Sequence, residues 1–471
     1  MNKILLVLLA LVLTLPVQAK KKNNYDLTVK INHGRDTMLL LGHYYGKGNR
    51  VIDTAYLDKK GLFHFSSDKQ KLPEGLCFFA NARGNYVEFV VYGEKPFFHF
   101  ETNEKDWTAH MTTKGSVQNE LFFNFHRQQS AIIHQIDSLS TRMDSAAFVT
   151  YRNSQYRRLD SLRLNIIETH PESFLSIMMT CTKDVYPPEY DSQGNKLTDR
   201  QRREYYLDHY FDNIPLENNA IIYTPEKVFS DRVMNYFDNI LKYASPEVII
   251  SHIDPLLQRA KNSPNIFQYL VINLTQKYLQ SNIMVYDQIY VHMVKNYFAS
   301  DLNFWSSPSS IEKESMRAAK WERLLIGKEA PELVLYDTLR VPHSLHAMPS
   351  KWKLLVFWSP SCGHCKHVIP TVYEVFEKYR DQYDIAAFTI LSEPDDKTRQ
   401  EWKEFLKKHN MNHPAWLSLD GGEANVDWHD VYDITSTPQI YLIDENNIIQ
   451  AKKLGEGNIE DIIKGICGEG L

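Results

Sequence analysis

The sequence predicts a multidomain α+β protein: an N-terminal antiparallel β sandwich or barrel, a central all-α domain and a C-terminal α/β domain. A chain of 471 residues is too long for one ordinary core. Short runs of aromatic and β-branched residues give way near residue 115 to apolar residues spaced three and four apart, and from about residue 324 strands and helices alternate. We therefore expect three domains behind a short leader.

The first residues have the pattern of a secretory signal. A lysine near the start is followed by an apolar stretch from Ile4 to Leu15 and by the small residues Val17 and Ala19. A membrane anchor is the alternative, but this stretch is short for a hydrocarbon core of about 30 Å. We therefore expect residues 1–19 to be a cleaved signal peptide, and the mature chain to lie in the periplasm or cell envelope without a membrane span.

Residues 24–106 are predicted to form the β domain. The runs DLTVKIN, RVIDTAYL, GLCFFANA and YVEFVVYG are rich in aromatic and β-branched residues, and turn-forming residues separate them. A small antiparallel sandwich or barrel accommodates such short strands. No cluster of residues with an obvious chemistry stands out in this part of the sequence.

Residues 115–322 are predicted to form the helical domain. In QNELFFNFHRQQSAIIHQIDSLSTRM the apolar residues recur at helical spacing, with charged residues on the opposite face. The polar stretch YPPEYDSQGNKLTDRQ indicates an exposed loop or lid. Further helices are expected over residues 151–168, 199–210, 246–262, 265–281 and 283–299.

Residues 325–471 are predicted to form the α/β domain. KLLVFW and DIAAFTIL are near-continuous apolar runs, as expected for parallel strands buried on both faces. A helical pattern follows each run, over 362–380 and in DKTRQEWKEFLKKHN. PAWLSL, QIYLID and NIIQAKKL supply further strands, the last two joined by a DENN turn, and NIEDIIKGIC closes the chain with a helix. The pattern predicts a βαβ core with an added hairpin.

The charge and the cysteine count exclude two classes of protein. The 53 basic and 58 acidic side chains nearly balance, so there is no electrostatic case for a nucleic-acid partner. The chain has only 5 cysteines, so it is not a disulfide-dense scaffold, and the odd number leaves at least one thiol unpaired within the chain. Cys77, Cys181 and Cys467 are expected to be small buried hydrophobic residues, with a Cys77–Cys181 bridge as the alternative.

The remaining two cysteines stand close together in the stretch VFWSPSCGHCKHVIP. Cys362 falls between a predicted buried strand and the helix that follows it, where free N–H groups and a partial positive charge favour a thiolate. Because the thiolate is the reactive form, Cys362 is the expected nucleophile, and Cys365, one helical turn further, is the expected resolving thiol. His364 between them would further stabilise the thiolate when protonated.

A metal site is the alternative for this cluster. Cys362, His364, Cys365 and His367 lie together, but a closed zinc site needs four convergent ligands, commonly in two pairs. The sequence contains no second Cys-x-x-Cys pair. A redox centre therefore explains the pair better than a metal site.

The segment FWSPSCGHCKHVIP resembles the active-site segment of the thioredoxin superfamily, and GKEAPELVL resembles the entry to its exported TlpA/ResA-like branch. Pro370 matches the family's helix-kinking proline, Thr437-Pro438 its cis-proline dipeptide, and Gly455 the glycine after its last strand. The resemblance implies a thioredoxin-like domain over 325–471. It also implies a cis bond before Pro438, where the backbone of Thr437 pairs with an extended substrate.

Two side chains of this segment, His364 and Trp358, are the expected redox-tuning residues. The sequence departs from the family where carboxylates would assist proton transfer, because those positions hold Val356 and Val368. His367 is a candidate replacement, and the proton acceptor is otherwise unassigned. More loosely, the front part of the chain resembles a β domain and a helical domain of unknown function that precede thioredoxin-like domains in exported Gram-negative proteins.

The predicted function is that of an exported thiol–disulfide oxidoreductase. It would act on protein disulfides or thiols through a mixed disulfide at Cys362, without a dissociable cofactor, and an unidentified redox partner would reset the cysteines. The direction of electron flow stays open. The alternative is an envelope binding or assembly protein that uses the thioredoxin-like domain only as a scaffold, because a fold alone does not confer activity.

Overall fold

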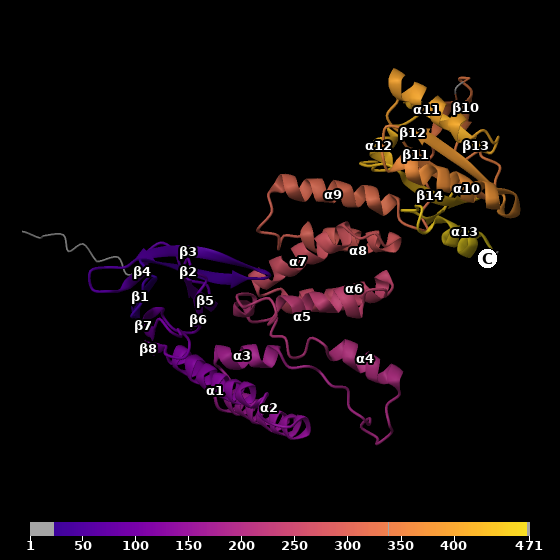
Figure 1. The fold of residues 1–471 in the computed structure, drawn as a ribbon. Helices are drawn as coiled ribbons and strands as arrows, with labels where there is room; N and C mark the ends of the chain where they lie inside the picture. Colours follow the sequence, from indigo (N-terminus) through magenta and orange to yellow (C-terminus); the bar gives the residue numbers. More distant parts are fainter. Residues whose placement is uncertain (1–22, 338, 469–471) are drawn as a thin grey trace, which may run out of the picture. The chain divides into compact units, whose positions relative to one another are not determined.

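The computed structural model describes residues 23–337 and 339–468, so the predicted signal peptide lies outside the described residues. The chain divides into two compact units, Met1–Ile240 and Leu241–Leu471 (Figure 1). This boundary falls inside the range predicted to be one helical domain, so the central helices are shared between the two units. None of the helices within the described ranges is both long enough and apolar enough to cross a membrane.

The first unit opens with two four-stranded sheets, ordered β4-β1-β7-β8 and β3-β2-β5-β6. Phe79 in one sheet lies 5.5 Å from Phe65 and 5.3 Å from Phe100 in the other, between ring centroids, so the two sheets share an aromatic core. The predicted sandwich is confirmed, and its strands pair antiparallel except β1 and β7, which run parallel. The strands are β1 (Tyr25–Asn32), β2 (Met38–Tyr45), β3 (Gly48–Tyr56), β4 (Phe63–Ser67), β5 (Gly75–Ala80), β6 (Tyr86–Val91), β7 (Phe97–Asn103) and β8 (Thr112–Lys114).

Helices complete the first unit. Ser116 caps the first of them by accepting a hydrogen bond from the backbone N–H of Asn119. The buried Asn119 side chain in turn bonds both backbone groups of Val90, at 2.7 and 2.8 Å, and so ties this helix to β6. The elements are α1 (Val117–Leu139), α2 (Ser145–Thr169), α3 (Phe174–Cys181), α4 (Asp199–His209), η1 (Asn219–Ile222), α5 (Ser230–Asn235) and η2 (Tyr236–Ile240).

The second unit begins with a helical segment, residues 241–323. Serine caps and an N-terminal proline start α6 and α9, as the sequence preferences for helix starts require. The predicted helix over 283–299 is divided into a 3-10 turn, an α-helix and a π-type turn. The elements are α6 (Pro246–Ala260), α7 (Pro264–Leu279), η3 (Met284–Tyr286), α8 (Asp287–Met293), η4 (Val294–Phe298) and α9 (Pro308–Arg323).

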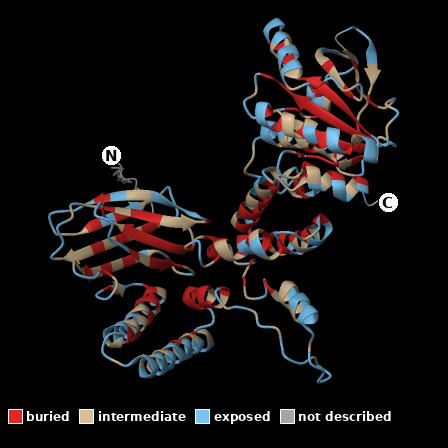
Figure 2. Cartoon of the chain, turned by 45° about the vertical axis from the view of Figure 1, so that its right-hand side comes forward, coloured by how far each residue is buried: buried red, intermediate tan, exposed pale blue. Residues whose placement is uncertain are grey.

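The α/β domain that follows has a seven-stranded sheet in the order β10-β9-β13-β12-β11-β14-β15. The two apolar runs form β11 and β12, which are parallel neighbours at the centre and buried along their whole length (Figure 2). The predicted hairpin is β14 and β15, which pair antiparallel. The strands are β9 (Val334–Asp337), β10 (Pro342–Ser344), β11 (Trp352–Trp358), β12 (Ile385–Leu391), β13 (Trp416–Ala424), β14 (Gln439–Asp444) and β15 (Ile449–Ala451).

Successive side chains of β11 point to opposite faces of this sheet and enter two separate cores. Leu354 and Val356 join a core with residues of α10 and α13, while Leu355 and Phe357 join a core with residues near α12. The helices are α10 (Cys365–Tyr383), α11 (Asp396–Lys408), α12 (Trp428–Val431) and α13 (Ile459–Gly468). Both faces of the sheet are therefore covered, which explains why the central runs are apolar throughout.

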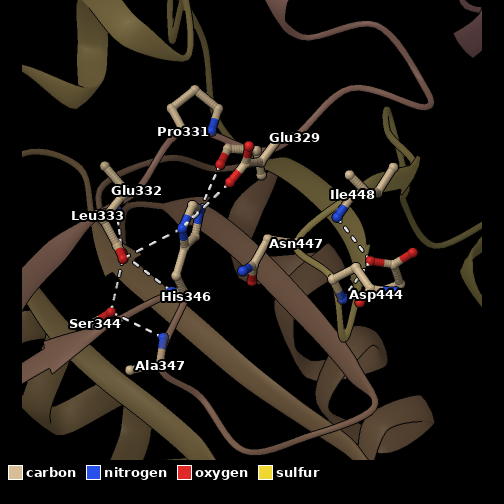
Figure 3. Close-up of polar contacts among 12 residues, drawn as sticks. Glu329, Pro331, Glu332, Leu333, Ser344, His346, Ala347, Asp444, Asn447 and Ile448 are labelled. Carbon is tan, nitrogen blue, oxygen red and sulfur yellow. Dashed lines mark hydrogen bonds and ion pairs between the residues drawn. The ribbon is translucent and has the colours of Figure 1, made fainter.

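A polar network around His346 lies near the amino-terminal end of β11 (Figure 3). Lys353 of β11 donates to the carbonyl oxygen of His346 at 3.5 Å. Glu332 accepts hydrogen bonds from the backbone N–H groups of Leu333 and His346, at 2.8 and 3.2 Å, and from the Ser344 hydroxyl at 2.9 Å. The ring of His346 bonds the carbonyl oxygen of Ala330 at 2.7 Å. These contacts fasten the segment that enters the domain to the sheet.

Candidate active site

Cys362 lies in the loop that joins the carboxyl end of β11 to α10. The helix begins at Cys365 rather than at residue 362 as predicted, so Cys362 stands just ahead of the helix. The backbone N–H of Cys365 donates a hydrogen bond to the Cys362 sulfur at 3.3 Å. The sulfur is therefore held by one of the N–H groups that a helix start leaves without an internal partner.

The environment of Cys362 favours its thiolate. Partial burial alone would raise the pKa of this thiol, but hydrogen bonds from the Cys365 side chain and backbone oppose it, with smaller contributions from Thr437 and from the backbone of His364. The net effect is a pKa below the usual value. A thiol with a lowered pKa and partial exposure is a competent nucleophile.

Cys365 has the opposite environment. Its side chain belongs to the buried core beneath α10, and burial raises the pKa of its thiol to about 12. Within the described residues all the cysteines are free, so the structure shows the dithiol form. One sulfur is thus accessible and acidic while the other is buried and held as a thiol, which are the properties that a nucleophile and a resolving thiol need. Cys77, Cys181 and Cys467 are buried, as predicted, and form no bridge.

The loop before β14 lies against the cysteine pair. The Thr437–Pro438 bond is cis, as predicted. The Cys362 thiol donates to the carbonyl oxygen of Thr437 at 3.3 Å, so this loop contacts the nucleophilic sulfur directly. The pairing of an extended substrate with Thr437 stays a prediction.

The two expected redox-tuning residues lie in different surroundings. Trp358 is fully buried in the core that contains Cys365, where its ring lies 5.1 Å from that of Phe405. It shares this buried core with Cys365, and its indole carries no charge. His364 is the exposed residue ahead of α10, and its backbone rather than its ring contributes to the lowered pKa of Cys362. An effect of the imidazole stays a prediction.

A carboxylate that the sequence did not point to lies beside the cysteine loop. Glu393 follows β12 and accepts hydrogen bonds from the hydroxyls of Ser361 at 3.0 Å and Ser359 at 3.4 Å. Val356 and Val368 are buried core residues, as expected of positions without a carboxylate. The signal for Glu393 was its place after the strand next to β11, because the carboxyl ends of parallel strands meet at one edge of the sheet.

The described residues give no support to a metal site. Across residues 23–337 and 339–468, no group of three or more His, Cys, Asp or Glu side chains is arranged to hold a metal ion. The site instead contains two cysteine thiols with different pKa values, beside the carbonyl oxygen of Thr437 and the cis-proline Pro438.

Comparison with known families agrees with this geometry. Residues 350–449 match a family profile described as Thioredoxin-like. Residues 25–122 and 195–318 match two families described as Domain of unknown function, DUF4369 and DUF5106. The C-terminal domain of this chain is thioredoxin-like, and two domains of unknown function precede it.

Two curated relatives are named as thiol–disulfide oxidoreductases, and this chain is a distant homologue of these enzymes. The chain is 27% identical over 141 residues to a Thiol-disulfide oxidoreductase ResA of Bacillus cereus, a match that covers 30% of this chain and 76% of the relative. It is 26% identical over 113 residues to the Thiol-disulfide oxidoreductase YkuV of Bacillus subtilis, a match that covers 24% of this chain and 73% of the relative.

Solved structures are also similar to parts of the chain. A thioredoxin-like protein from Bacteroides caccae matches 59% of this chain and 97% of its own, with a TM-score of 0.48 and 18% identity. A domain of a possible thiol-disulfide isomerase from Cytophaga hutchinsonii matches 31% of this chain and 95% of its own, with a TM-score of 0.28 and 30% identity.

Proposed function

We propose that this protein is an exported thiol–disulfide oxidoreductase that acts on protein disulfides or thiols through Cys362 and Cys365. The observation that carries the proposal is the unequal pair of sulfurs. Cys362 accepts the N–H of Cys365 at 3.3 Å and has a lowered pKa, while burial raises the pKa of Cys365 to about 12. A scaffold without activity has no need for this difference.

The reaction transfers two electrons by thiol–disulfide exchange. The Cys362 thiolate attacks one sulfur of a substrate disulfide, that S–S bond breaks, and the departing thiolate takes a proton from water. Cys365 then loses its proton and attacks the Cys362 sulfur, which forms the Cys362–Cys365 disulfide and releases the second substrate thiolate. An external dithiol must then reduce the enzyme, and the same steps in reverse oxidise a substrate dithiol.

Protein substrates and export rest on separate observations. The relatives named as thiol–disulfide oxidoreductases support a disulfide-bearing substrate, and the loop at Thr437, whose carbonyl oxygen contacts the Cys362 sulfur, offers an extended chain a backbone to pair with. The signal-like residues 1–19 support a location in the periplasm or cell envelope. Mass spectrometry of the chain from an envelope fraction tests export, with an expected N-terminus just after Ala19.

Trapping of mixed disulfides tests the activity. In Cys365→Ser the first attack still occurs but the resolving step cannot, so substrates stay bonded to Cys362 and appear as thiol-sensitive adducts on non-reducing gels. Cys362→Ser lowers disulfide reductase activity by about 10³-fold or more, because the attacking sulfur is gone.

Two controls complete this experiment. The double variant Cys362→Ser/Cys365→Ser traps nothing, and Cys467→Ala, which alters a buried cysteine outside the pair, keeps the activity. An empty lane for Cys365→Ser together with an inactive wild-type enzyme would exclude the oxidoreductase and leave the scaffold alternative.

A further inference from the structure

A polar cleft opens beside the cysteine pair within the second unit. It has a volume of about 560 Å³, within the usual range for sites that bind small ligands or short segments of chain. On the α/β side it is lined by His364, Ser436, Pro438 and Gln439. Since Thr437 between these residues contacts the Cys362 sulfur, a chain seated in the cleft lies next to the nucleophile.

The helical segment ahead of the α/β domain supplies the other lining of this cleft. Gln280 and Asn282, in the turn after α7, contribute to it together with Asp287 of α8 and Trp321 of α9. These residues belong to the part of the chain that is matched by, or directly follows, a family of unknown function, and none belongs to the thioredoxin-like domain. The cleft therefore combines two domains of this particular chain.

Buried ion pairs hold the helical lining in place. Asp287, which is 3% exposed, pairs with Lys452 at 2.5 Å and with Lys453 at 2.7 Å, both from the segment after β15. Lys452 also donates to the carbonyl oxygen of Leu324 at 2.8 Å. Because Asp287 and Lys452 are both buried, removing either side chain would leave the other charge without compensation, so the pair fixes the position of α8 against the segment after β15.

A second contact fixes the end of α9. The indole N–H of Trp321 donates to the Asp433 carboxylate at 2.7 Å, and the Lys453 ammonium lies 5.6 Å from the centre of the same ring. Met284 adds an apolar contact, because it packs against the core that contains Cys365. The helical lining of the cleft is thus held in place by contacts with the α/β domain.

The charges of the cleft are already balanced. Two lysines, Lys452 and Lys453, and two aspartates, Asp287 and Asp433, line it, and each has a partner described above. The charges of these four side chains sum to zero, so a charged ligand would lose its hydration without meeting a net opposite charge in the lining. The balance favours an uncharged occupant.

The uncharged polar groups of the cleft are available for hydrogen bonds. Among the described residues, the side chains of Gln280, Asn282, Thr435 and Gln439 make no hydrogen bond with the protein. Carboxamides and hydroxyls both donate and accept, so they match the alternating N–H and C=O groups of an extended chain and the side chains of Ser, Asn and Gln.

We infer that the helical segment 241–323 is the specificity wall of the active site, and that the cleft takes an extended peptide segment whose cysteine is flanked by uncharged polar residues. This inference rests on the proposed function and adds its substrate class. In it, Gln280 and Asn282 are specificity residues that touch the substrate, while Asp287 positions the wall.

Substitutions that add a charge to the helical lining of the cleft test this inference, with peptides of defined charge as substrates. The probes are three disulfide-linked peptide dimers whose cysteine is flanked by Ser and Gln, by Asp, or by Lys, with hydroxyethyl disulfide as a small neutral substrate and glutathione disulfide as an anionic one. The wild-type enzyme should reduce the uncharged peptide at least about threefold faster than either charged peptide in kcat/KM. Asn282→Lys should raise kcat/KM for the Asp peptide and lower it for the Lys peptide, each by about three- to fivefold, and Asn282→Asp should do the reverse.

The matched control is Gln276→Lys, which adds the same charge to an exposed position of α7 outside the cleft lining. It should leave both the peptide preferences and the turnover of hydroxyethyl disulfide unchanged. Equal rates for the three peptides in wild type, equal shifts in Gln276→Lys, or faster turnover of glutathione disulfide than of any peptide would each overturn the inference. Failure to reduce hydroxyethyl disulfide and every peptide would instead refute the proposed function.

Discussion

The two ends of β11 carry two polar clusters with opposite properties. At the amino-terminal end, Glu332, Ser344 and His346 bond one another and the nearby backbone (Figure 3). At the carboxyl end, Cys362 is partly exposed, and Gln439, which follows the cis-proline loop, makes no side-chain hydrogen bond with the described residues. Phe357 pairs with Gln439 at this end, while Trp352 pairs with Asp444 at the other.

The difference separates polar groups that stabilise a domain from polar groups that react or bind. A network whose members satisfy one another has little capacity left for a ligand, and removing a member costs stability. Groups that are held in place by neighbours but left without partners are free to bind. A stabilising polar network therefore lies at one end of β11, and the reactive Cys362 lies at the other.

Alkylation of the two cysteines should give the largest difference. Because the pKa of Cys362 lies below the usual value and that of Cys365 is raised to about 12, their thiolate fractions near neutral pH differ by about 10³-fold or more. Iodoacetamide labelling followed by peptide mapping should modify Cys362 first, with a rate that rises through a midpoint below pH 9. Equal labelling of both sulfurs at neutral pH would remove the contrast between them.

Removal of the Glu332 carboxylate should lower stability and leave the chemistry alone. Glu332→Ala leaves two backbone N–H groups and one hydroxyl without their acceptor, so we expect a loss of about 1–3 kcal/mol in the free energy of unfolding. Denaturant unfolding measures this loss, and the turnover of a small disulfide at 25 °C should not change. Glu332→Gln keeps an acceptor oxygen and should lose less; a reduced rate in folded Glu332→Ala protein would show that the two ends are coupled.

Neutralising Glu393 should have the smallest effect. Glu393→Gln keeps an acceptor for the Ser361 and Ser359 hydroxyls but weakens both hydrogen bonds, so we expect the loop to be held less firmly and the resolving step to slow by about two- to fivefold. Single-turnover decay of the mixed disulfide measures this step. Ser361→Ala removes one of the same contacts and should act in the same direction. A slowing of about 10² or more in Glu393→Gln would mean that the carboxylate takes part in proton transfer.

The sequence was sufficient to predict those strands and helices whose apolar residues follow a regular pattern. The runs KLLVFW and DIAAFTIL became the parallel neighbours β11 and β12, since strands buried on both faces must be apolar throughout. The helical pattern predicts a start at residue 362, whereas α10 begins at Cys365, because helix ends depend on backbone hydrogen bonds that the sequence does not show. The sequence also could not predict that β1 and β7 pair in parallel, because these strands are distant in the chain.

By itself the sequence determined the cysteine pair, because a strand, a short turn and a helix place Cys362 and Cys365 together by local geometry alone, whereas the cis-proline loop was expected only from the resemblance to the thioredoxin superfamily. The tertiary structure decided which side chains surround them. Glu393 meets Ser361, Asp287 meets Lys452 and Lys453, and Trp321 meets Asp433 only after segments far apart in the chain have packed together. Such partners follow no sequence period, since long-range contacts are chosen by the shape and charge of whole packed surfaces.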